Sequence, residues 1–153
     1  MDFPRQCGPI ACVDEASPDT NVVLDEGGRL TTLDVAWFDY WACSTFAGFV
    51  FKPAGVEFDG HSPPAIGRMF VVDEPLDWYL VQPGQVSTLG YVGPDGEVPG
   101  YGTVEIMDIE RTPVGRPISV VGTVTAGDAS WSVEGTFRAT RCGNGWGPGF
   151  PCE

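Results

Sequence analysis

Glycine and proline are spread so evenly along this chain that long helices have almost no room. The 153 residues include 21 glycines and 14 prolines, and only the segment from Arg29 to Ala47 runs far without either residue. Glycine destabilises a helix interior through backbone entropy, and proline does so through its ring and its missing N–H. The spacing therefore favours an all-β fold of short strands joined by turns.

Between the turn signals lie segments rich in β-branched and aromatic residues, which strands prefer. The pattern predicts strands at Arg68–Val72, Trp78–Gln82, Val86–Val92, Gly102–Ile109, Ile118–Thr125 and Ser130–Cys142. In the last of these, Trp131, Val133 and Phe137 alternate with polar residues, as in a strand with one buried face. The chain is long enough for one domain, so we expect a single antiparallel sandwich or barrel.

The segment near residues 32–47 fits either a helix or a pair of strands. Leu33, Ala36, Trp37 and Tyr40 have helical spacing, and Thr32 can cap such a helix. The aromatic and β-branched residues that follow along the chain fit a pair of strands equally well. We favour strands here, and one short helix near residues 32–47 is the alternative.

The turn-rich ends of the chain divide it into three parts. Residues 1–20 contain cysteines and prolines without a sustained apolar period, which predicts an irregular N-terminal arm. Residues 21–142 form the β domain, and residues 143–153 form a tail rich in glycine and proline. A disulfide that closes the tail would hold it in place.

The five cysteines indicate disulfides rather than a metal site, because none of them forms a C-x-x-C pair. Our first pairing joins Cys142 to Cys152 across the tail, and our second joins Cys7 to Cys12. Cys43 is then the free thiol. An alternative pattern ties Cys7 or Cys12 to the C-terminal pair, which would hold both chain ends on one side of the domain.

Disulfides persist in oxidising compartments, so we expect an extracytoplasmic protein, either secreted or on the cell surface. The first residues, from Met1 to Cys7, lack the basic segment and apolar run of a secretory signal. We therefore expect that the signal segment has been removed from this chain. No apolar run is long enough to span a bilayer.

The hairpin sequence from Gly122 to Cys142 adds one resemblance. Its G-T-V strand, its E-G-T-F-R-A-T strand and the cysteine that follows resemble the closing strands of small, uncharacterised β-rich secreted or lipoprotein domains of myxobacteria and related bacteria. The resemblance covers this hairpin alone. It implies an exported, lipoprotein-like β domain and no particular chemistry.

The net negative charge of the chain argues against one class of partner, nucleic acid. The chain has 21 acidic against 8 basic residues, which gives a net charge of -13 and an isoelectric point near 4.2. Such a surface repels phosphate groups, so we expect no nucleic-acid partner. A glycan, a protein or a second copy of this chain remain as candidate partners.

Acidic turns give one candidate metal site. Asp73, Asp77, Asp95 and Glu97 lie beside turn residues and offer the oxygen ligands that calcium prefers. No EF-hand loop accompanies them, so we favour carboxylates that solvate the loops. We expect no cofactor, and calcium is the alternative.

Aromatic residues give a candidate ligand site at Trp37, Tyr40 and Trp41. In a strand, Trp37 and Trp41 share one face while Tyr40 lies on the other, and an exposed aromatic face can stack on a sugar ring or anchor a partner. We favour burial of both faces, because a chain of this length needs large aromatic residues in its core.

Catalytic patterns are weak. His61 is the only histidine, it lies in a turn sequence, and no G-x-S-x-G motif accompanies it. The many carboxylates leave open a hydrolase that uses a carboxylate pair, but the sequence identifies no pair. Nucleotide-binding glycine loops are absent from the sequence.

We therefore expect a non-enzymatic, exported β domain of the binding or adhesion type. Two alternatives follow from the same sequence. One is an extracellular structural subunit that assembles with copies of itself through open strand edges. The other is a small hydrolase that uses a carboxylate pair or His61.

Overall fold

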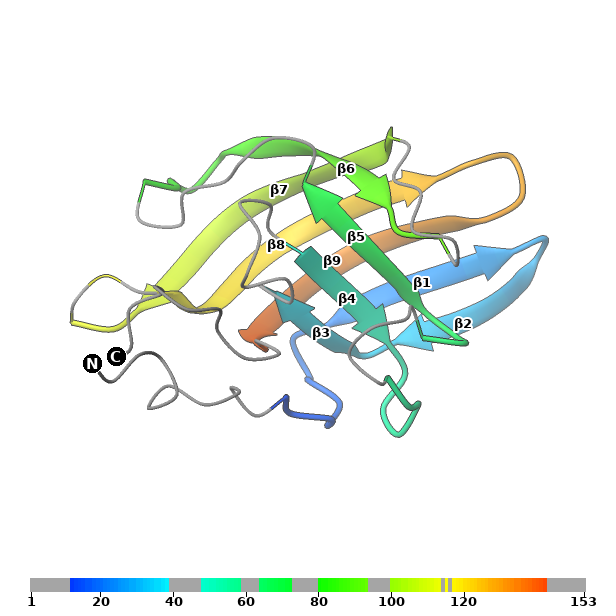
Figure 1. The fold of residues 1–153 in the computed structure, drawn as a ribbon, viewed down its shortest axis with the longest axis horizontal. Helices are drawn as coiled ribbons and strands as arrows, with labels where there is room; N and C mark the ends of the chain where they lie inside the picture. The colour runs from blue at the N-terminus through cyan, green and yellow to red at the C-terminus, as the bar shows by residue number, and fades with distance from the viewer. Residues whose placement is uncertain are drawn as a thin grey trace, which may run out of the picture.

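The computed structural model describes residues 12–38, 48–58, 64–72, 80–93, 100–113, 115 and 117–142. These residues are all-β and contain no helix (Figure 1). The strands in chain order are β1 Asn21–Glu26, β2 Arg29–Leu33, β3 Val35–Phe38, β4 Gly48–Lys52, β5 Arg68–Val72, β6 Val86–Tyr91, β7 Gly100–Arg111, β8 Pro117–Gly127 and β9 Ser132–Arg141.

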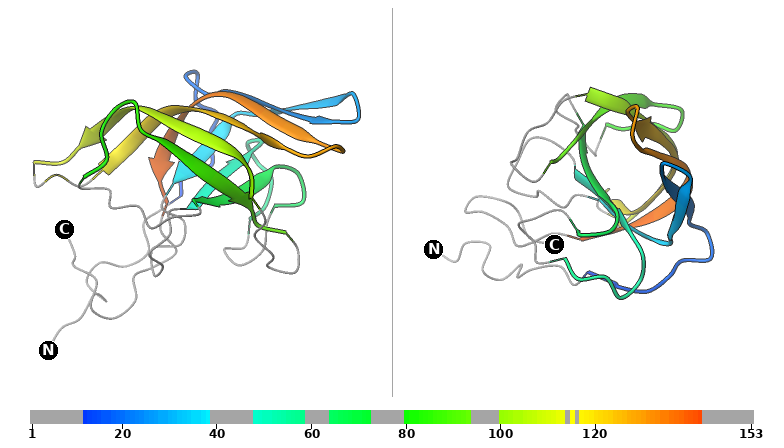
Figure 2. Two further views of the ribbon diagram at one scale, coloured as in Figure 1. Left: turned by 90° about the horizontal axis from the view of Figure 1, so that it is seen from above. Right: turned by 90° about the vertical axis from the view of Figure 1, so that its right-hand side faces the viewer.

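Seven of the strands close into a barrel. The order around the ring is β9-β3-β4-β5-β6-β7-β8, and β8 pairs again with β9. The right-hand view of Figure 2 shows this ring from one end. Neighbours in the ring are antiparallel, except that β3 and β9 run parallel where they meet at Trp37–Thr140 and Phe38–Arg141.

Strands β1 and β2 form a hairpin that extends the sheet beside the ring. The hairpin turns through Gly27 and Gly28, both with positive φ, between the paired residues Glu26 and Arg29. Two-residue turns with positive φ match the twist of a hairpin, and glycine adopts them without strain. Strand β1 pairs with the first half of β9, and β3 pairs with its end.

Thr20 hydrogen-bonds to β9 in the interval between the residues that pair with β1 and those that pair with β3. Its hydroxyl accepts a hydrogen bond from the Arg138 N–H at 3.0 Å and lies 3.4 Å from the Arg138 carbonyl oxygen, to which it donates. Arg138 lies between Thr136, the last residue paired with β1, and Thr140, the first paired with β3. A buried threonine therefore satisfies the backbone of β9 where no strand does.

The barrel interior is filled by one hydrophobic cluster. Four phenylalanine rings lie at its centre, with neighbouring ring centroids 5.1–6.3 Å apart. These rings belong to Phe49, Phe51, Phe70 and Phe137. Aliphatic residues from the other strands, including Leu24, Ile106 and Val133, complete the cluster. The interior is a packed core.

A second hydrophobic cluster covers the outer face of β3, β4 and β5. Its buried members are Val35, Trp37, Val50, Met69, Val71, Val92 and Cys142. The N-terminal arm crosses this face, and the Trp37 indole N–H donates a hydrogen bond of 2.9 Å to the Val13 carbonyl. All residues of β3 to β5 are buried: side chains on one face of these strands lie in the barrel core, and Val35, Trp37, Val50, Met69 and Val71 on the other face belong to the second cluster.

The arm also neutralises a buried cation. Lys52 is fully buried, and its ammonium group forms a 2.5 Å ion pair with Asp14 and lies 5.1 Å from the Trp37 ring centroid. Hydrogen bonds from Lys52 and from the Gly55 N–H lower the pKa of Asp14 below its usual value. Asp14 thus stays ionised beside Lys52 at neutral pH, which offsets the cost of burying the lysine.

One disulfide ties the arm to the end of β9. Cys12 bonds to Cys142, with 4.8 Å between their Cα atoms. This pairing corrects the two that we derived from local spacing, Cys142–Cys152 and Cys7–Cys12, and follows the alternative pattern. The physical reason is the sheet: the Cys142 N–H donates to the Phe38 carbonyl, which brings Cys142 beside the strand that the arm crosses.

Most predicted strands are present. β5 has the predicted bounds, and β6 to β9 differ from the predictions by a few residues at their ends. The predicted strand Trp78–Gln82 is wrong over its described part, because residues 80–82 form a turn and loop. Of the segment that admitted a helix, residues 32–33 and 35–38 lie in strands, and residues 39–47 lie outside the described residues.

Val133 tests the predicted register of β9. Its side chain is fully buried in the barrel, and an aspartate there would place an unpaired charge in the core at a cost on the order of 3–5 kcal/mol. We expect Val133→Asp to abolish cooperative unfolding measured by circular dichroism. Thr136→Asp is the matched control, because Thr136 is exposed on the same strand. A folded Val133→Asp protein would show that the register is wrong.

The disulfide gives a second prediction. The bridge closes a loop with a sequence separation of 130, so losing it should lower the free energy of unfolding by about 2–5 kcal/mol. Cys12→Ser, Cys142→Ser and the double variant should lose the same amount under oxidising conditions. Cys152→Ser is the discriminating control in denaturant titrations. Equal losses in Cys152→Ser and Cys142→Ser would support closure of the tail instead.

Candidate functional site

Strand ends converge on one open end of the barrel, at the right of Figure 1, where the β1–β2 turn and the β8–β9 loop both point. We call this end the hairpin mouth. The residues that define it are Glu26 at the end of β1, Arg68 at the start of β5, Tyr91 at the end of β6, Tyr101 near the start of β7 and Trp131 just before β9. Because neighbouring strands are antiparallel, the ends of β1 and β6 and the starts of β5, β7 and β9 lie at the same end of the barrel.

Three aromatic side chains, the mouth triad, pack together there. Ring centroids are 5.0 Å apart for Tyr91 and Trp131, 5.8 Å for Tyr101 and Trp131, and 6.1 Å for the two tyrosines. Each ring is half-buried, and the planes are inclined as aromatic pairs prefer. Phe70 lies 6.1 Å from Trp131 and 6.2 Å from Tyr91, which joins the triad to the core.

A β-bulge brings Tyr101 into the triad. The register of β6 and β7 pairs Leu89 with Gly102 but Gly90 with Gly100, so Tyr101 is the additional residue. With Val104 facing the core, strict alternation would place residue 101 on the outer face of the barrel. The bulge instead turns the ring toward Tyr91 and Trp131, which is the re-aiming that bulges commonly produce beside functional sites.

Arg68 packs against the triad and is 8% exposed. Its guanidinium carbon is 4.6 Å from the Trp131 centroid and 5.7 Å from that of Tyr91. One terminal nitrogen donates to Glu26 at 3.1 Å, and the other donates to the Gly67 carbonyl at 2.7 Å. The Nε atom is buried and has no hydrogen-bond partner. Arg68 thus packs against the Trp131 and Tyr91 rings and links both hairpins to β5.

Asp128 fixes the loop that presents Trp131. One carboxylate oxygen accepts hydrogen bonds from the Ser130 N–H and hydroxyl, both at 2.7 Å, and from the Trp131 N–H at 3.2 Å. The Asp128 N–H donates to the Trp131 carbonyl, which closes the loop. These bonds, those from Ser130 above all, lower the pKa of Asp128 below its usual value, and the charge of Arg68 adds to the effect.

The hairpin mouth is suited to binding. Half-buried aromatic rings that already pack together offer apolar surface that is ordered before a ligand binds. Barrel mouths are common positions for ligand sites. The carboxylate of Glu26 is partly exposed beside the rings and adds an acceptor.

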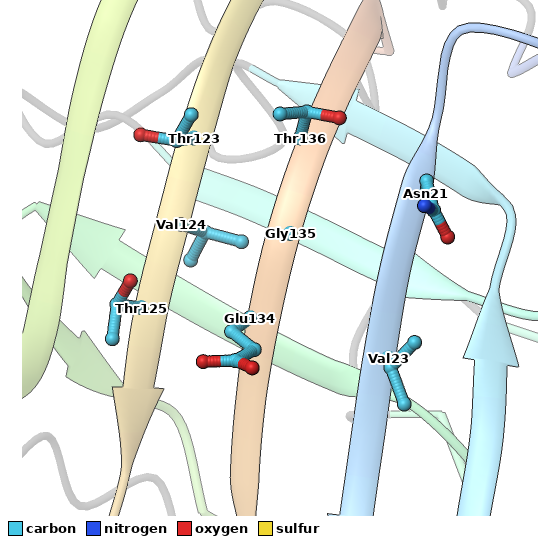
Figure 3. Close-up of a pocket in the computed structure, with 8 residues that line it drawn as sticks. All are labelled: Asn21, Val23, Thr123, Val124, Thr125, Glu134, Gly135 and Thr136. Carbon is cyan, nitrogen blue, oxygen red and sulfur yellow. The ribbon is translucent and has the colours of Figure 1, made fainter.

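A shallow groove of about 430 Å³ crosses the outer face of β8, β9 and β1 (Figure 3). Its walls are two cross-strand rows of short side chains: Thr123, Thr136 and Asn21 form one row, and Thr125, Glu134 and Val23 form the other. Gly135 lies between the rows, and a Cβ there would meet the Asn21 carbonyl oxygen at 2.0 Å. The groove offers one carboxylate and no aromatic ring, so it is the weaker candidate.

Of the three residues in the sequence-derived ligand site, the structure describes Trp37 alone. Trp37 is 4% exposed, contacts Phe58 at 5.9 Å between centroids, and lies under the arm. Tyr40 and Trp41 lie outside the described residues. The described part of that segment therefore belongs to the core.

The other candidate residues lie largely beyond the described ranges. Asp73, Asp77, Asp95 and Glu97, the expected calcium ligands, are outside them, and so are His61, Cys7, Cys43 and Cys152. Within the described ranges, no group of three or more His, Cys, Asp or Glu side chains is placed to hold a metal ion.

Sequence reasoning missed the hairpin mouth because its residues come from separate strands. Arg68, Tyr91 and Tyr101 stand at strand ends with no motif around them. Two local signals were available: an aromatic residue after the turn sequence A-G-D-A-S, and an arginine at the head of an otherwise apolar strand. An arginine in that position needs a partner, which the fold supplies as Glu26 and Trp131.

No protein-family model, curated protein or solved structure matches this chain. In the part of the chain that the structure describes, no helix is long and apolar enough to cross a membrane.

Asp128 gives a pH prediction. Its pKa is lowered in the folded state, so the ionised carboxylate stabilises the fold at neutral pH, and this contribution is lost as the pH falls below about 4 toward the folded pKa. Asp128→Asn removes the titration. We expect the wild type to be more stable than Asp128→Asn near pH 7 and the difference to shrink toward pH 2, measured by urea unfolding. A difference independent of pH would contradict this role.

Proposed function

We propose that this chain is an exported, non-enzymatic binding domain that takes its ligand at the hairpin mouth. The observation that carries the proposal is the mouth triad: three half-buried aromatic rings from β6, β7 and the β8–β9 loop, which meet at one barrel end and of which Arg68 contacts two. Aromatic residues of this kind dominate the energetics of binding sites.

The ordering of the triad supports a binding role beyond barrel stability. A bulge re-aims Tyr101, and Asp128 fixes the loop before Trp131. Rings held in place lose little conformational freedom when a ligand binds, so more of the contact energy remains as affinity. Residues Trp37 and Val13, by contrast, only hold the arm on the barrel.

The disulfide supports the exported part of the proposal. Bridges such as Cys12–Cys142 persist in oxidising compartments, and this one joins segments that are far apart in the sequence. The hairpin's resemblance to secreted and lipoprotein domains of myxobacteria points the same way. A surface with net charge -13 fits a role that avoids nucleic acid.

A second function, self-assembly into a structural subunit, is favoured by one observation. In the described sheet, β2 pairs with β1 on one side and is the terminal strand on the other, and its Leu30 is 67% exposed. Open strand edges can pair with another copy. A concentration-dependent oligomer that Thr32→Pro removes would support this function, because the Thr32 N–H faces away from β1 and proline lacks the N–H that an added strand needs.

Trp131→Ala tests the main proposal. Four probe classes are titrated into the full-length protein by isothermal titration calorimetry: neutral oligosaccharides, acidic oligosaccharides, tetramethylammonium and a peptide library. We expect one class to bind the wild type and Trp131→Ala to weaken that binding about tenfold or more, since the ring supplies the central contact.

Thr136→Ala is the matched control, because Thr136 is exposed in the groove on the outer face of the barrel. It should leave affinity unchanged. Binding that survives in a folded Trp131→Ala protein, or the absence of binding by any class, would reject the hairpin mouth as the site.

A further inference from the structure

The open edge of β2 determines how two copies of this chain can pair. Resting on the second function proposed above, self-assembly through β2, we infer that β2 pairs with β2 of another copy about a two-fold axis and that assembly stops at this dimer. The inference depends on which backbone groups of β2 are free, on their positions along the strand, and on the number of open edges in the sheet.

The free groups of β2 follow from its hairpin with β1. Glu26 and Arg29 flank the two-residue turn and pair directly, and every second residue after Arg29 directs its N–H and C=O groups toward β1. Leu30 and Thr32 therefore direct theirs away from β1. In the part of the chain that the structure describes, these outward groups form no hydrogen bond.

Strand β2 lacks most of the features that protect open edges. It contains no proline, no lysine and no register shift against β1. It is the outer strand of its hairpin (Figure 1), and its Leu30 side chain is 67% exposed. Thr32 is exposed on the same face two residues later. An added strand therefore meets free backbone groups and an apolar side chain.

The free groups are arranged symmetrically about Thr31. A two-fold axis at Thr31 places Leu30 of each copy opposite Thr32 of the other, so the free N–H and C=O groups of one copy all meet those of its mate. Thr31 then faces Thr31 of the other copy, and Arg29 faces Leu33. No like charges lie directly opposite each other, and such threonine pairs stabilise a sheet. The edge is thus complementary to itself.

Other registers lack free groups. A register shifted by two residues toward the turn needs the Gly28 N–H, which already donates to the Asp25 carboxylate at 2.8 Å. The opposite shift needs the Asp34 carbonyl, which already accepts from the Ser17 N–H at 2.9 Å. A shift by one residue sets the free groups against residues that face β1. The register centred on Thr31 is therefore the one that pairs free groups with free groups.

The number of open edges sets the size of the assembly. Every other strand of the described sheet lies between two neighbours, because β8 pairs again with β9. Pairing of two β2 strands consequently uses the open edge of both copies, and an isologous interface of this kind closes at two. Since the paired strands run antiparallel, the two hairpin mouths of the dimer point in opposite directions.

Concentration and salt give the first test, on the full-length, disulfide-bonded protein. A five-residue edge is small for an interface, so we expect a weak dimer that dissociates on dilution in sedimentation equilibrium. Each copy has a net charge of -13, and the copies repel each other. The Kd of the dimer should therefore fall about threefold or more from low to high salt, as screening increases.

Disulfide trapping tests the register. In Thr31→Cys the two new thiols lie on directly opposed residues, whose Cα atoms are about 4.5 Å apart in a non-hydrogen-bonded pair, and a disulfide fits there. Oxidised glutathione should link this variant into dimers on non-reducing gels. Thr32→Cys is the matched control: residue 32 is more exposed, but its two copies lie too far apart in the dimer to be bridged. The wild type controls for the native cysteines.

A pair of edge variants tests the backbone contact. Thr32→Pro should abolish the dimer because it removes a free N–H, whereas Thr32→Val should retain it because the N–H remains. Circular dichroism checks that both variants fold. A dimer that survives Thr32→Pro, or equal linking of Thr32→Cys and Thr31→Cys, would overturn the inferred pairing.

The remaining failures separate this inference from the functions proposed above. If Thr32→Pro removes an oligomer larger than two, self-assembly through β2 stands and the two-fold closure is wrong. If the wild type stays monomeric at every concentration and salt, the dimer and self-assembly through β2 are both rejected. Neither result affects the ligand site at the hairpin mouth, which Trp131→Ala tests separately.

Discussion

The whole fold depends on β9 being hydrogen-bonded along both of its edges. One edge pairs with β8 from Ser132 to Thr140, and the other is divided between β1 and β3. Thr20 bridges the interval through Arg138. Without this divided pairing the sheet would remain open, and the phenylalanine core would face water. Closure at β9 also determines which cysteines form the disulfide, because it places Cys142 beside β3.

Arg68 connects the core to the candidate binding surface. Burying a guanidinium is costly unless its charge and its donors find partners. Here Glu26 and Gly67 accept hydrogen bonds from the two terminal nitrogens and two aromatic faces contact the charge, while Nε has no hydrogen-bond partner. The same contacts hold the β1–β2 hairpin and the β8–β9 loop at one end of the barrel. A single residue thereby stabilises the barrel end and orders the rings that a ligand would contact.

Local sequence patterns located the strands well and the site poorly. Alternation identified β9 and its buried face, and turn signals bounded β5 to β8 within a few residues. The β1–β2 hairpin was not predicted as strands, although Gly27–Gly28 between two β-rich runs is its signal. The mouth triad could not be found this way, since a bulge reverses the expected side of Tyr101 and its partners are distant in sequence. The contacts of the arm with Trp37 and Lys52 likewise join residues far apart in the sequence.

The sequence by itself determined an acidic, all-β chain of one domain, because glycine and proline exclude long helices and two-residue alternation defines strand faces. Only the tertiary structure decided that the sheet closes as a barrel with a parallel β3–β9 contact, that Cys12 pairs with Cys142, and that Tyr91, Tyr101 and Trp131 meet. These are contacts between residues far apart in the chain. Strand register and closure fix such contacts, and no local pattern encodes them.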